Sequence, residues 1–437
     1  MSINASWGKV EISPDEKISL YRFDKKERKS KKINDPLFVT VLLIDDNNLK
    51  TVIVSLDLIW ISNSFSDSIK SIIKKNYKIP EDLIFICATH THSSPDILYL
   101  EKYEPNIAIL FKESIIKKIN KIIFNCISQL APVNFFFSKS ILNETVYRRK
   151  KILSPQYLKK LKIKFEILNR PALNHFVDNV LTTVKLVSKN NKKTFYIVNY
   201  SSHPSIYRGN LISAEYPGYI RKFILDENSS DDGLMFLQGF CGNLKPRLFE
   251  YPKFNFKKPL HSVYDKIFDS IRFKKSYDIK DVEDYATKIS DVIKNSDFEK
   301  IKDDIFKIKG AINSTNLKES KTGKIIKSQV HALKFSDKII FLGINGEIFM
   351  EYSLWLRSKI PLIIPVGYTN GMTGYIPDDK SLSIGGYEVE RSLYNFDQKN
   401  KLQKGVEHKI KKIINLSLKQ IDIIDYKFKN KVYEKKN

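Results

Sequence analysis

The segment Leu83-Ile-Phe-Ile-Cys-Ala88 is continuously apolar, and Thr89-His90-Thr-His92-Ser-Ser-Pro95 follows it without a break. A short apolar run of this kind is typical of a strand that is buried on both faces. Residues two apart at a strand end project to the same side, so both imidazoles can face one point. The segment therefore predicts a buried strand that ends in two converging histidines. The motif is short, and a pair of loop histidines that bind nothing is an equally good interpretation of it alone.

Strands and helices alternate on both sides of this segment. Periodicity predicts further strands at residues 37–44, 51–60, 181–187, 195–200, 234–238, 330–335, 338–344 and 362–366. It predicts helices at residues 64–77, 107–130, 216–225, 348–359 and 402–418, and amphipathic helices within the Lys- and Asp-rich stretch 254–316. This mixture predicts the α/β class, as one large layered domain with mixed β-sheets flanked by helices. We place a boundary near residue 395, which separates a domain at 1–395 from a basic helical extension at 396–437.

The composition excludes several classes of protein. The chain has 437 residues, 42% of them hydrophobic, which excludes a globally disordered protein. The 74 Lys and Arg against 49 Asp and Glu give a formal net charge of +25. Because the lysines are scattered and accompany abundant Ile and Asn, we interpret this charge as compositional bias and predict no nucleic-acid partner. A basic surface does suit an anionic substrate or a peripheral membrane contact.

The sequence also indicates the cellular compartment in which the protein is expected. No apolar run approaches the roughly 18 residues that a membrane span needs. Residues 1–7 lack the basic and apolar regions of a secretory signal. Cys87, Cys126 and Cys241 are odd in number and have no paired spacing, so a disulfide scaffold is not expected. We therefore expect a reduced, cytoplasmic protein.

One other histidine shares the setting of His90. His203 lies in Val198-Asn-Tyr-Ser-Ser-His203-Pro204, immediately after another apolar strand. Imidazoles at two strand exits are what a first-row metal site, and zinc in particular, requires. The remaining histidines lie in polar or lysine-rich surroundings, and we interpret them as surface or internally satisfied residues: His175, His261, His331 and His408.

Three further features have more than one interpretation. Glu347 follows Gly346 at a third strand exit, where it is either a ligand or a glutamate in the first turn of a helix. Asp57 lies inside an apolar strand, where a charge has to be paired or ligating. It is either a partner of a ligand histidine or a strand-edge carboxylate. The glycine-rich segment 367–377, which contains Tyr375, is either a pocket loop or part of the core, and its glycines favour the loop.

These segments, in this order, resemble the catalytic domain of the neutral/alkaline (non-lysosomal) ceramidase family. The resemblance runs from about residue 7 to residue 392, and the ordered set of motifs carries it. The motifs are WGKVEISP (7–14), VSLD (54–57), ATHTHSSP (88–95), VNYSSHP (198–204), SAEYPG (213–218), LQGFCGN (237–243) with Pro246, GE (346–347), GYIP (374–377) and GGYE (385–388).

The resemblance implies one zinc ion per chain, with His90, His203, Glu347 and Tyr375 as its ligands. It also implies that His92 lines the site and that Arg148 is the active-site arginine, although the motif match there allows Arg149.

Two departures from the family stand out. Lys245 occupies the position of the family's serine in the glycine turn 242–246, and the residues after Ser392 are too few for the family's C-terminal immunoglobulin-like domain. We therefore expect a distant member with a changed substrate.

The expected activity is hydrolysis of an N-acyl (amide) bond by metal-activated water. His92 would move the proton, and Arg148 and Lys245 would hold an oxyanion or an anionic substrate group. A lysine side chain that turns outward to solvent is the alternative for Lys245. Expected substrates are an N-acylated small molecule, sugar or lipid. An esterase or deacetylase, a transferase that runs the acyl chemistry in reverse, and a metal-binding descendant that has lost the activity remain alternatives.

Overall fold

The computed structural model describes residues 3–423, except 16, 24–26, 154–164, 191–192, 226–230, 252–255, 258, 260–262, 264–270, 275–276 and 303–305. The apolar run that precedes the HxH motif forms β5 (Ile84–Ala88), which is buried along its whole length. It pairs in parallel with β4 (Lys50–Leu56), whose side chains are also nearly all buried. This continuous burial explains why neither strand shows polar alternation.

β5 is the edge of a nine-stranded mixed sheet in the order β12-β10-β9-β6-β1-β3-β4-β5, with β16 paired to β6. The pairs β4–β5 and β10–β12 are parallel, and the others are antiparallel. The remaining strands of this sheet are β1 (Asn4–Glu11), β3 (Phe38–Asp45), β6 (Ala131–Ile141), β9 (Val180–Ser188), β10 (Thr194–Tyr200), β12 (Gly233–Gln238) and β16 (Glu299–Lys300).

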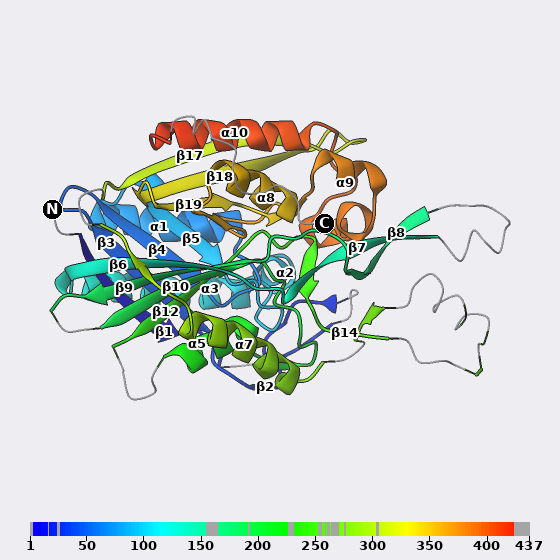
Figure 1. The fold of residues 1–437 in the computed structure, drawn as a ribbon, viewed down its shortest axis with the longest axis horizontal. Helices are drawn as coiled ribbons and strands as arrows, with labels where there is room; N and C mark the ends of the chain where they lie inside the picture. The colour runs from blue at the N-terminus through cyan, green and yellow to red at the C-terminus, as the bar shows by residue number, and fades with distance from the viewer. Residues whose placement is uncertain are drawn as a thin grey trace.

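A second, four-stranded sheet packs beside the first (Figure 1). Its strands, in order, are β17 (Lys309–Lys318), β18 (Ile325–Ser336), β19 (Ile339–Ile344) and β21 (Ile363–Val366). Smaller sheets join β13 (Leu244–Pro246), β7 (Thr145–Leu153) and β8 (Phe165–Ala172); β20 (Glu347–Ile348) and β22 (Tyr375–Ile376); β2 (Lys32–Ile33) and β11 (Leu211–Ile212); and β14 (Phe249–Glu250) and β15 (Arg272–Phe273).

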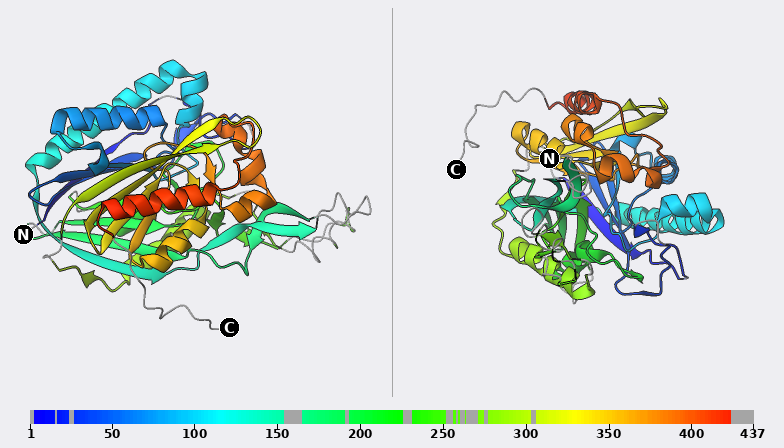
Figure 2. Two further views of the ribbon diagram at one scale, coloured as in Figure 1. Left: turned by 90° about the horizontal axis from the view of Figure 1, so that it is seen from above. Right: turned by 90° about the vertical axis from the view of Figure 1, so that its right-hand side faces the viewer.

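Helices cover the outer faces of these sheets. α10 (Val406–Gln420) lies along β17 and β18, while α5 (Glu215–Ile224) and α7 (Ile279–Lys294) pack together on the opposite side of the molecule (Figure 1). α1 (Asn63–Tyr77) and α3 (Pro105–Ser128) lie side by side along one flank, with α3 against β1 and β3 (Figure 2). The other helical segments are η2 (Glu81–Leu83), α2 (Ile97–Tyr103), α8 (Met350–Lys359), α9 (Asp379–Ile384), η4 (Tyr387–Arg391) and η5 (Leu393–Phe396). Among the helices that the structure describes, none combines the length and apolarity that crossing a bilayer requires.

The segment after β21 ties several strand ends together. The amide of Gly367 donates to the carbonyl of Gln238 at the end of β12, and the amide of Tyr368 donates to Gly346 just after β19. The carbonyl of Tyr368 accepts from Ala88 at the end of β5. Backbone hydrogen bonds therefore bring the ends of strands that are distant in sequence to one place.

The α/β class, the mixed sheets and the flanking helices are confirmed, and each strand and helix predicted by position has a counterpart within a few residues. The prediction for 254–316 is partly wrong. α7 is an amphipathic helix with a buried face, but residues 309–318 form strand β17. Cross-strand pairing with β18 and packing under α10 override the helical pattern there. The strands β1, β6, β7 and β8, and the strands of two or three residues, were not predicted. The division at residue 395 stays a prediction.

Candidate metal centre

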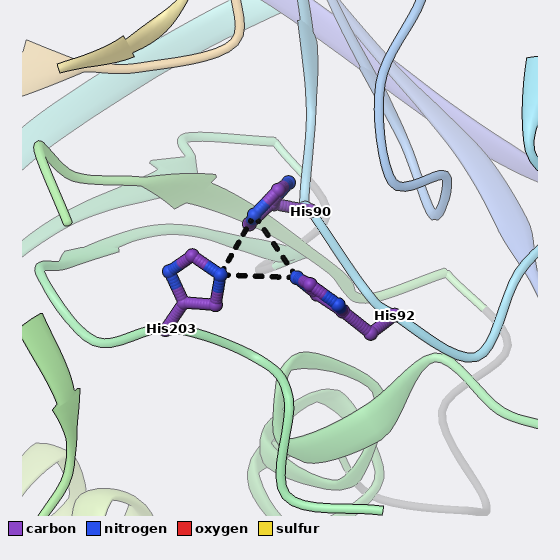
Figure 3. A group of neighbouring side chains, drawn as sticks. All are labelled: His90, His92 and His203. Atoms are coloured by element: carbon purple, nitrogen blue, oxygen red, sulfur yellow. Dashed lines mark hydrogen bonds between the residues drawn. The ribbon is translucent and has the colours of Figure 1, made fainter. Parts of the chain in front are cut away.

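Three buried histidines from two loops meet at one point (Figure 3). Nε2 of His90 lies 3.2 Å from Nε2 of His92 and 3.2 Å from Nε2 of His203, and the Nε2 atoms of His92 and His203 are 3.0 Å apart. Three converging imidazole nitrogens are a donor set that suits zinc. The structure thus brings together both histidines of the HxH motif and the histidine of the second strand exit.

The backbone at His90 adopts a conformation that is uncommon for a residue with a side chain. Its φ is +66°, in the left-handed region. The amide of His90 donates to the carbonyl of Leu58, 2.9 Å away, which holds this turn. Conformations of this kind cluster at functional sites, where the surrounding structure pays for the strain.

Backbone carbonyls orient two of the three rings. Nδ1 of His90 lies 2.7 Å from the carbonyl oxygen of Ile59, and Nδ1 of His203 lies 3.3 Å from that of Cys241. Because a carbonyl only accepts, each ring carries its proton on Nδ1 and turns the Nε2 lone pair toward the cluster. Nδ1 of His92 differs, because it has no hydrogen-bond partner in the part of the chain that the structure describes.

Burial keeps the three rings neutral. It lowers the pKa of His90 to about 3, and it lowers the pKa values of His92 and His203 well below their usual range. The positive charge of Arg148 lowers all three pKa values further. A metal binds neutral imidazole, so the cluster is in the right protonation state at neutral pH.

Glu347 and Tyr375 stand directly opposite each other in the parallel pair β20–β22. Oε2 of Glu347 lies 3.6 Å from Nε2 of His90 and 3.9 Å from Nε2 of His203. The two strands can approach closely because Gly346 has no side chain. A Cβ at that position would lie only 2.7 Å from the carbonyl oxygen of Gly374. Burial raises the pKa of Glu347 to about 8, and the nearby Arg148 opposes this shift.

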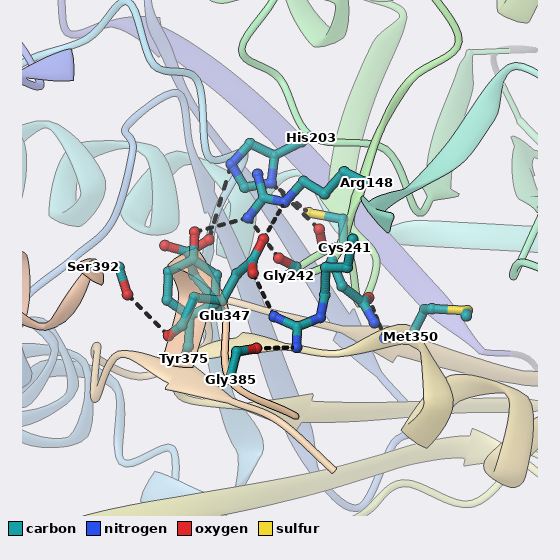
Figure 4. A network of polar contacts seen from close by, with 12 residues as sticks. Arg148, His203, Cys241, Gly242, Glu347, Met350, Tyr375, Gly385 and Ser392 are labelled. Atoms are coloured by element: carbon teal, nitrogen blue, oxygen red, sulfur yellow. Dashed lines mark hydrogen bonds and ion pairs between the residues drawn. The ribbon is translucent and has the colours of Figure 1, made fainter. Parts of the chain in front are cut away.

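Arg148 points into the site from β7 (Figure 4). Its Nη2 donates to the hydroxyl of Tyr375 at 3.0 Å and to the carbonyl of Gly242 at 2.6 Å. Its Nε lies 2.9 Å from Oε1 of Glu388 without hydrogen-bonding alignment. Arg149 binds the other oxygen of Glu388 at 2.5 Å, but its remaining bonds go to backbone carbonyls of Ser381 and Gly385. Arg148, rather than Arg149, therefore contacts Tyr375.

Lys245 is buried on β13 rather than turned out to solvent. Its Nζ lies 4.8 Å from the centre of the Phe273 ring, and its positive charge is one of the causes that lower the pKa of His203.

The interpretation of Asp57 as the partner of a ligand histidine is wrong. Its Oδ2 lies 2.7 Å from Arg221 and accepts from the amide of Phe38, while His90 binds the Ile59 carbonyl instead. A buried charge at that position is paired, as expected, but with an arginine of α5.

The other histidines lie outside the cluster. His331 is buried, with Nε2 2.8 Å from the carbonyl of Asp82 and Nδ1 2.9 Å from the side chain of Asn370. His175 and His408 are exposed, and His261 lies outside the described residues.

Several residues around the site were not predicted. The rings of Tyr21 and Phe23 contact His92, with centroid separations of 4.5 and 5.4 Å, and Tyr368 stacks on His90 at 3.8 Å. The buried Arg28 donates to the carbonyls of Tyr21 and His92, and so fastens two loops of the site to each other. No local pattern marks these residues, because each acts through a contact with a distant segment.

Two solved structures are similar to this fold. The crystal structure of neutral ceramidase from Pseudomonas aeruginosa matches with a TM-score of 0.66 and 15% identity, over 89% of this chain and 70% of that chain. A structure described as ceramidase complexed with C2 matches with a TM-score of 0.66 and 14% identity, over 89% and 71%. No family model and no curated protein sequence matches the chain. The resemblance to neutral ceramidase that the motifs predict is thus confirmed for the fold.

The side chains present fit a metal ion. Two Nε2 lone pairs, each fixed by a carbonyl on the far side of its ring, point at one place, and the third Nε2 lies within 3.2 Å of both. Without a cation, lone pairs so arranged repel one another. The buried carboxyl group of Glu347 beside them supplies a further oxygen ligand, and it would lose its proton when a divalent ion binds.

Proposed function

We propose that this chain is a zinc-dependent hydrolase that cleaves a non-peptide N-acyl (amide) bond. The observation that carries the proposal is the convergence of the His90, His92 and His203 Nε2 atoms beside the Glu347 carboxylate. The ceramidase fold supports it, because ceramidases act on an amide. His90, His203, Glu347 and Tyr375 would hold one zinc ion per chain.

When bound, zinc polarises the acyl oxygen and lowers the pKa of a water molecule to about 7. His92 would carry a proton from that water to the leaving amine. Within the described residues no carbonyl contacts its Nδ1, in contrast to the other two rings, so no fixed acceptor there assigns its proton to one nitrogen. This difference favours a proton-transfer role for His92 over a role as third imidazole ligand, although its Nε2 lies as close to the others as they lie to each other.

Arg148 would stabilise the negative charge that develops on the acyl oxygen. Its guanidinium is held by the carbonyl of Gly242 and by Glu388, so it stays in position before the reaction begins. A donor that needs no reorganisation is worth most in a buried site. Its bond to the Tyr375 hydroxyl also fixes the orientation of a proposed ligand.

Lys245 in the serine position of the family favours water as the nucleophile over a covalent intermediate. A buried cation there suits a substrate that carries negative charge. The substrate classes we propose are therefore N-acylated small molecules, sugars or lipids, with anionic members preferred over neutral ceramide.

The test combines metal content with a hydrolysis panel. Elemental analysis of the purified chain should find about one zinc per chain, and His90→Ala/His203→Ala should lose it. His331→Gln is the matched control, because His331 is equally buried but lies outside the cluster. The panel compares ceramide, N-acyl amino acids, N-acetylated sugar phosphates and the ester analogue of each.

Cleavage of an amide that depends on the two histidines would support the proposal. Faster cleavage of the esters would favour the esterase alternative. Zinc binding without hydrolysis of any panel member would contradict the activity but not the metal centre, and a full complement of zinc in the double variant would contradict the ligand assignment.

A further inference from the structure

A second arginine lies close to the site, and the described part of the chain provides no anionic partner for it. Arg208 follows His203 by five residues on the loop after β10, and it is partly exposed to solvent. Its Nε is buried with no hydrogen-bond partner, and in the part of the chain that the structure describes its guanidinium forms no ion pair. It packs on Phe23, whose ring centre lies 5.0 Å from Cζ.

Phe23 connects this arginine to the proposed proton carrier. The Phe23 ring stacks on His92 with a centroid separation of 5.4 Å and an angle of 15° between the planes. Cζ of Arg28 lies 4.7 Å from the same ring, so two guanidinium groups contact one aromatic side chain beside His92. The charges of both arginines lower the pKa of His92, which is consistent with this proximity.

Among the described residues, no carboxylate forms an ion pair with either of these two cations. Arg28 donates to the backbone carbonyls of Tyr21, His92 and Gly209, which are neutral acceptors. Glu215 is a carboxyl group whose charge would act on Arg28; it is fully buried and accepts from the amide of Tyr207. Burial raises the pKa of Glu215 to about 8, so it is mostly protonated at neutral pH. Burial also lowers the pKa of Arg28 to about 10, and the charge of Arg208 contributes to that lowering.

The positive charges of Arg28 and Arg208 repel each other, and an anion bound near both would reduce this repulsion. A guanidinium matches the two oxygens of a carboxylate or a phosphate in one plane, and its affinity for them increases when it is partly desolvated. Arg28 is held by its three carbonyls, whereas Arg208 is partly exposed to solvent and its Nε has no hydrogen-bond partner among the described residues. The site thus has one guanidinium held in place, that of Arg28, and a second, that of Arg208, which solvent can reach.

We infer that Arg208, backed by Arg28, binds an anionic group of the substrate, a carboxylate or a phosphate, on the amine side of the scissile bond. The placement on the amine side rests on the proposed function, because His92 beneath Phe23 is the group that would protonate the leaving amine. The inference makes Arg208 a specificity-determining residue and extends the charge preference beyond Lys245.

Anion binding can be measured without turnover. The full chain, as purified and after metal removal, is titrated calorimetrically with inorganic phosphate, with N-acetylglycine and with uncharged N-acetylglycinamide. We expect at least one anion to bind and the neutral amide to bind at least tenfold more weakly. Arg208→Gln should weaken binding of that anion by about 10- to 100-fold, the size expected for lost hydrogen bonds to a charged group. Arg208→Lys should recover part of the loss. The tighter of the two anions identifies the chemistry of the natural group.

Arg22→Gln is the matched control, because Arg22 also stacks on an aromatic ring, with Cζ 4.3 Å from the centre of Tyr99. It should bind the anion as the wild type does. If an amide substrate is found, Arg208→Gln should raise KM for its anionic form and leave the neutral form unchanged.

The inference is overturned if neither anion binds the metal-free chain, or if Arg208→Gln binds it as tightly as wild type. Anion binding that depends on Arg208 in a chain that hydrolyses no amide would leave this inference standing while the proposed function fails.

Discussion

Two consecutive arginines share one buried carboxylate, and this arrangement allows stability to be separated from activity. Arg148 and Arg149 each contact Glu388, and all three side chains are buried. Arg148 continues to Tyr375 and Gly242, whereas Arg149 continues to the carbonyls of Ser381 and Gly385. Replacing either by glutamine should therefore weaken the fold, but only Arg148→Gln should reduce turnover.

The geometry sets the size of each effect. Either single arginine variant leaves Glu388 with one guanidinium, so the cost is that of lost hydrogen bonds to a charged group, about 2 kcal/mol. Glu388→Gln leaves two buried guanidinium groups without a carboxylate, and should cost about 3–5 kcal/mol. Loss of a preorganised donor to the developing oxyanion lowers kcat by about 10²–10³-fold, and this loss applies to Arg148→Gln.

The assay is guanidinium chloride unfolding of the three variants, with kcat on the best amide substrate measured under native conditions. Zinc content is measured in each, so that an indirect loss of metal is detected. The interpretation would be refuted if Arg149→Gln lost as much turnover as Arg148→Gln while both retained zinc. A Glu388→Gln variant as stable as wild type would show that the two arginines do not depend on that carboxylate.

Three further predictions follow from the same site. His92→Ala should keep its zinc and lose about 10²–10⁴-fold in kcat; metal loss as complete as in His90→Ala would make His92 a ligand instead. Lys245→Ser should shift the hydrolysis panel from anionic substrates toward ceramide, and an unaltered ranking would show that Lys245 does not read the substrate. Burial raises the pKa of Asp96 from 3.8 to about 6. Because its folded pKa is raised, the folded state binds the proton more tightly, and stability is lost as pH rises from about 4 to 6. Asp96→Asn keeps an oxygen that can accept from Trp60 and Tyr99, so it should match wild type near pH 4 and exceed it by about 3 kcal/mol at pH 7; equal urea unfolding curves of the two proteins at pH 7 would contradict this.

Local sequence patterns were sufficient for much of the fold. Apolar runs and helical spacing depend on neighbours within a few residues, and they predicted β5, β10, α1 and α3 correctly. The same patterns placed His90 and His203 at strand exits. They failed for β17, where the partner strand and α10, rather than the residues themselves, select the extended conformation.

Residues far apart in sequence supplied what local patterns could not. Whether Arg148 or Arg149 faces the site depends on β7 and on Tyr375, more than 200 residues further along the chain. The choice between the two interpretations of Asp57 depended on Arg221, and the contacts of Phe23 with His92 and Arg208 had no signature in the sequence. The sequence by itself determined the class of fold and the histidines that meet. Only the tertiary structure decided the partner of each buried charge, because burial makes pairing obligatory without specifying which distant side chain will lie within reach.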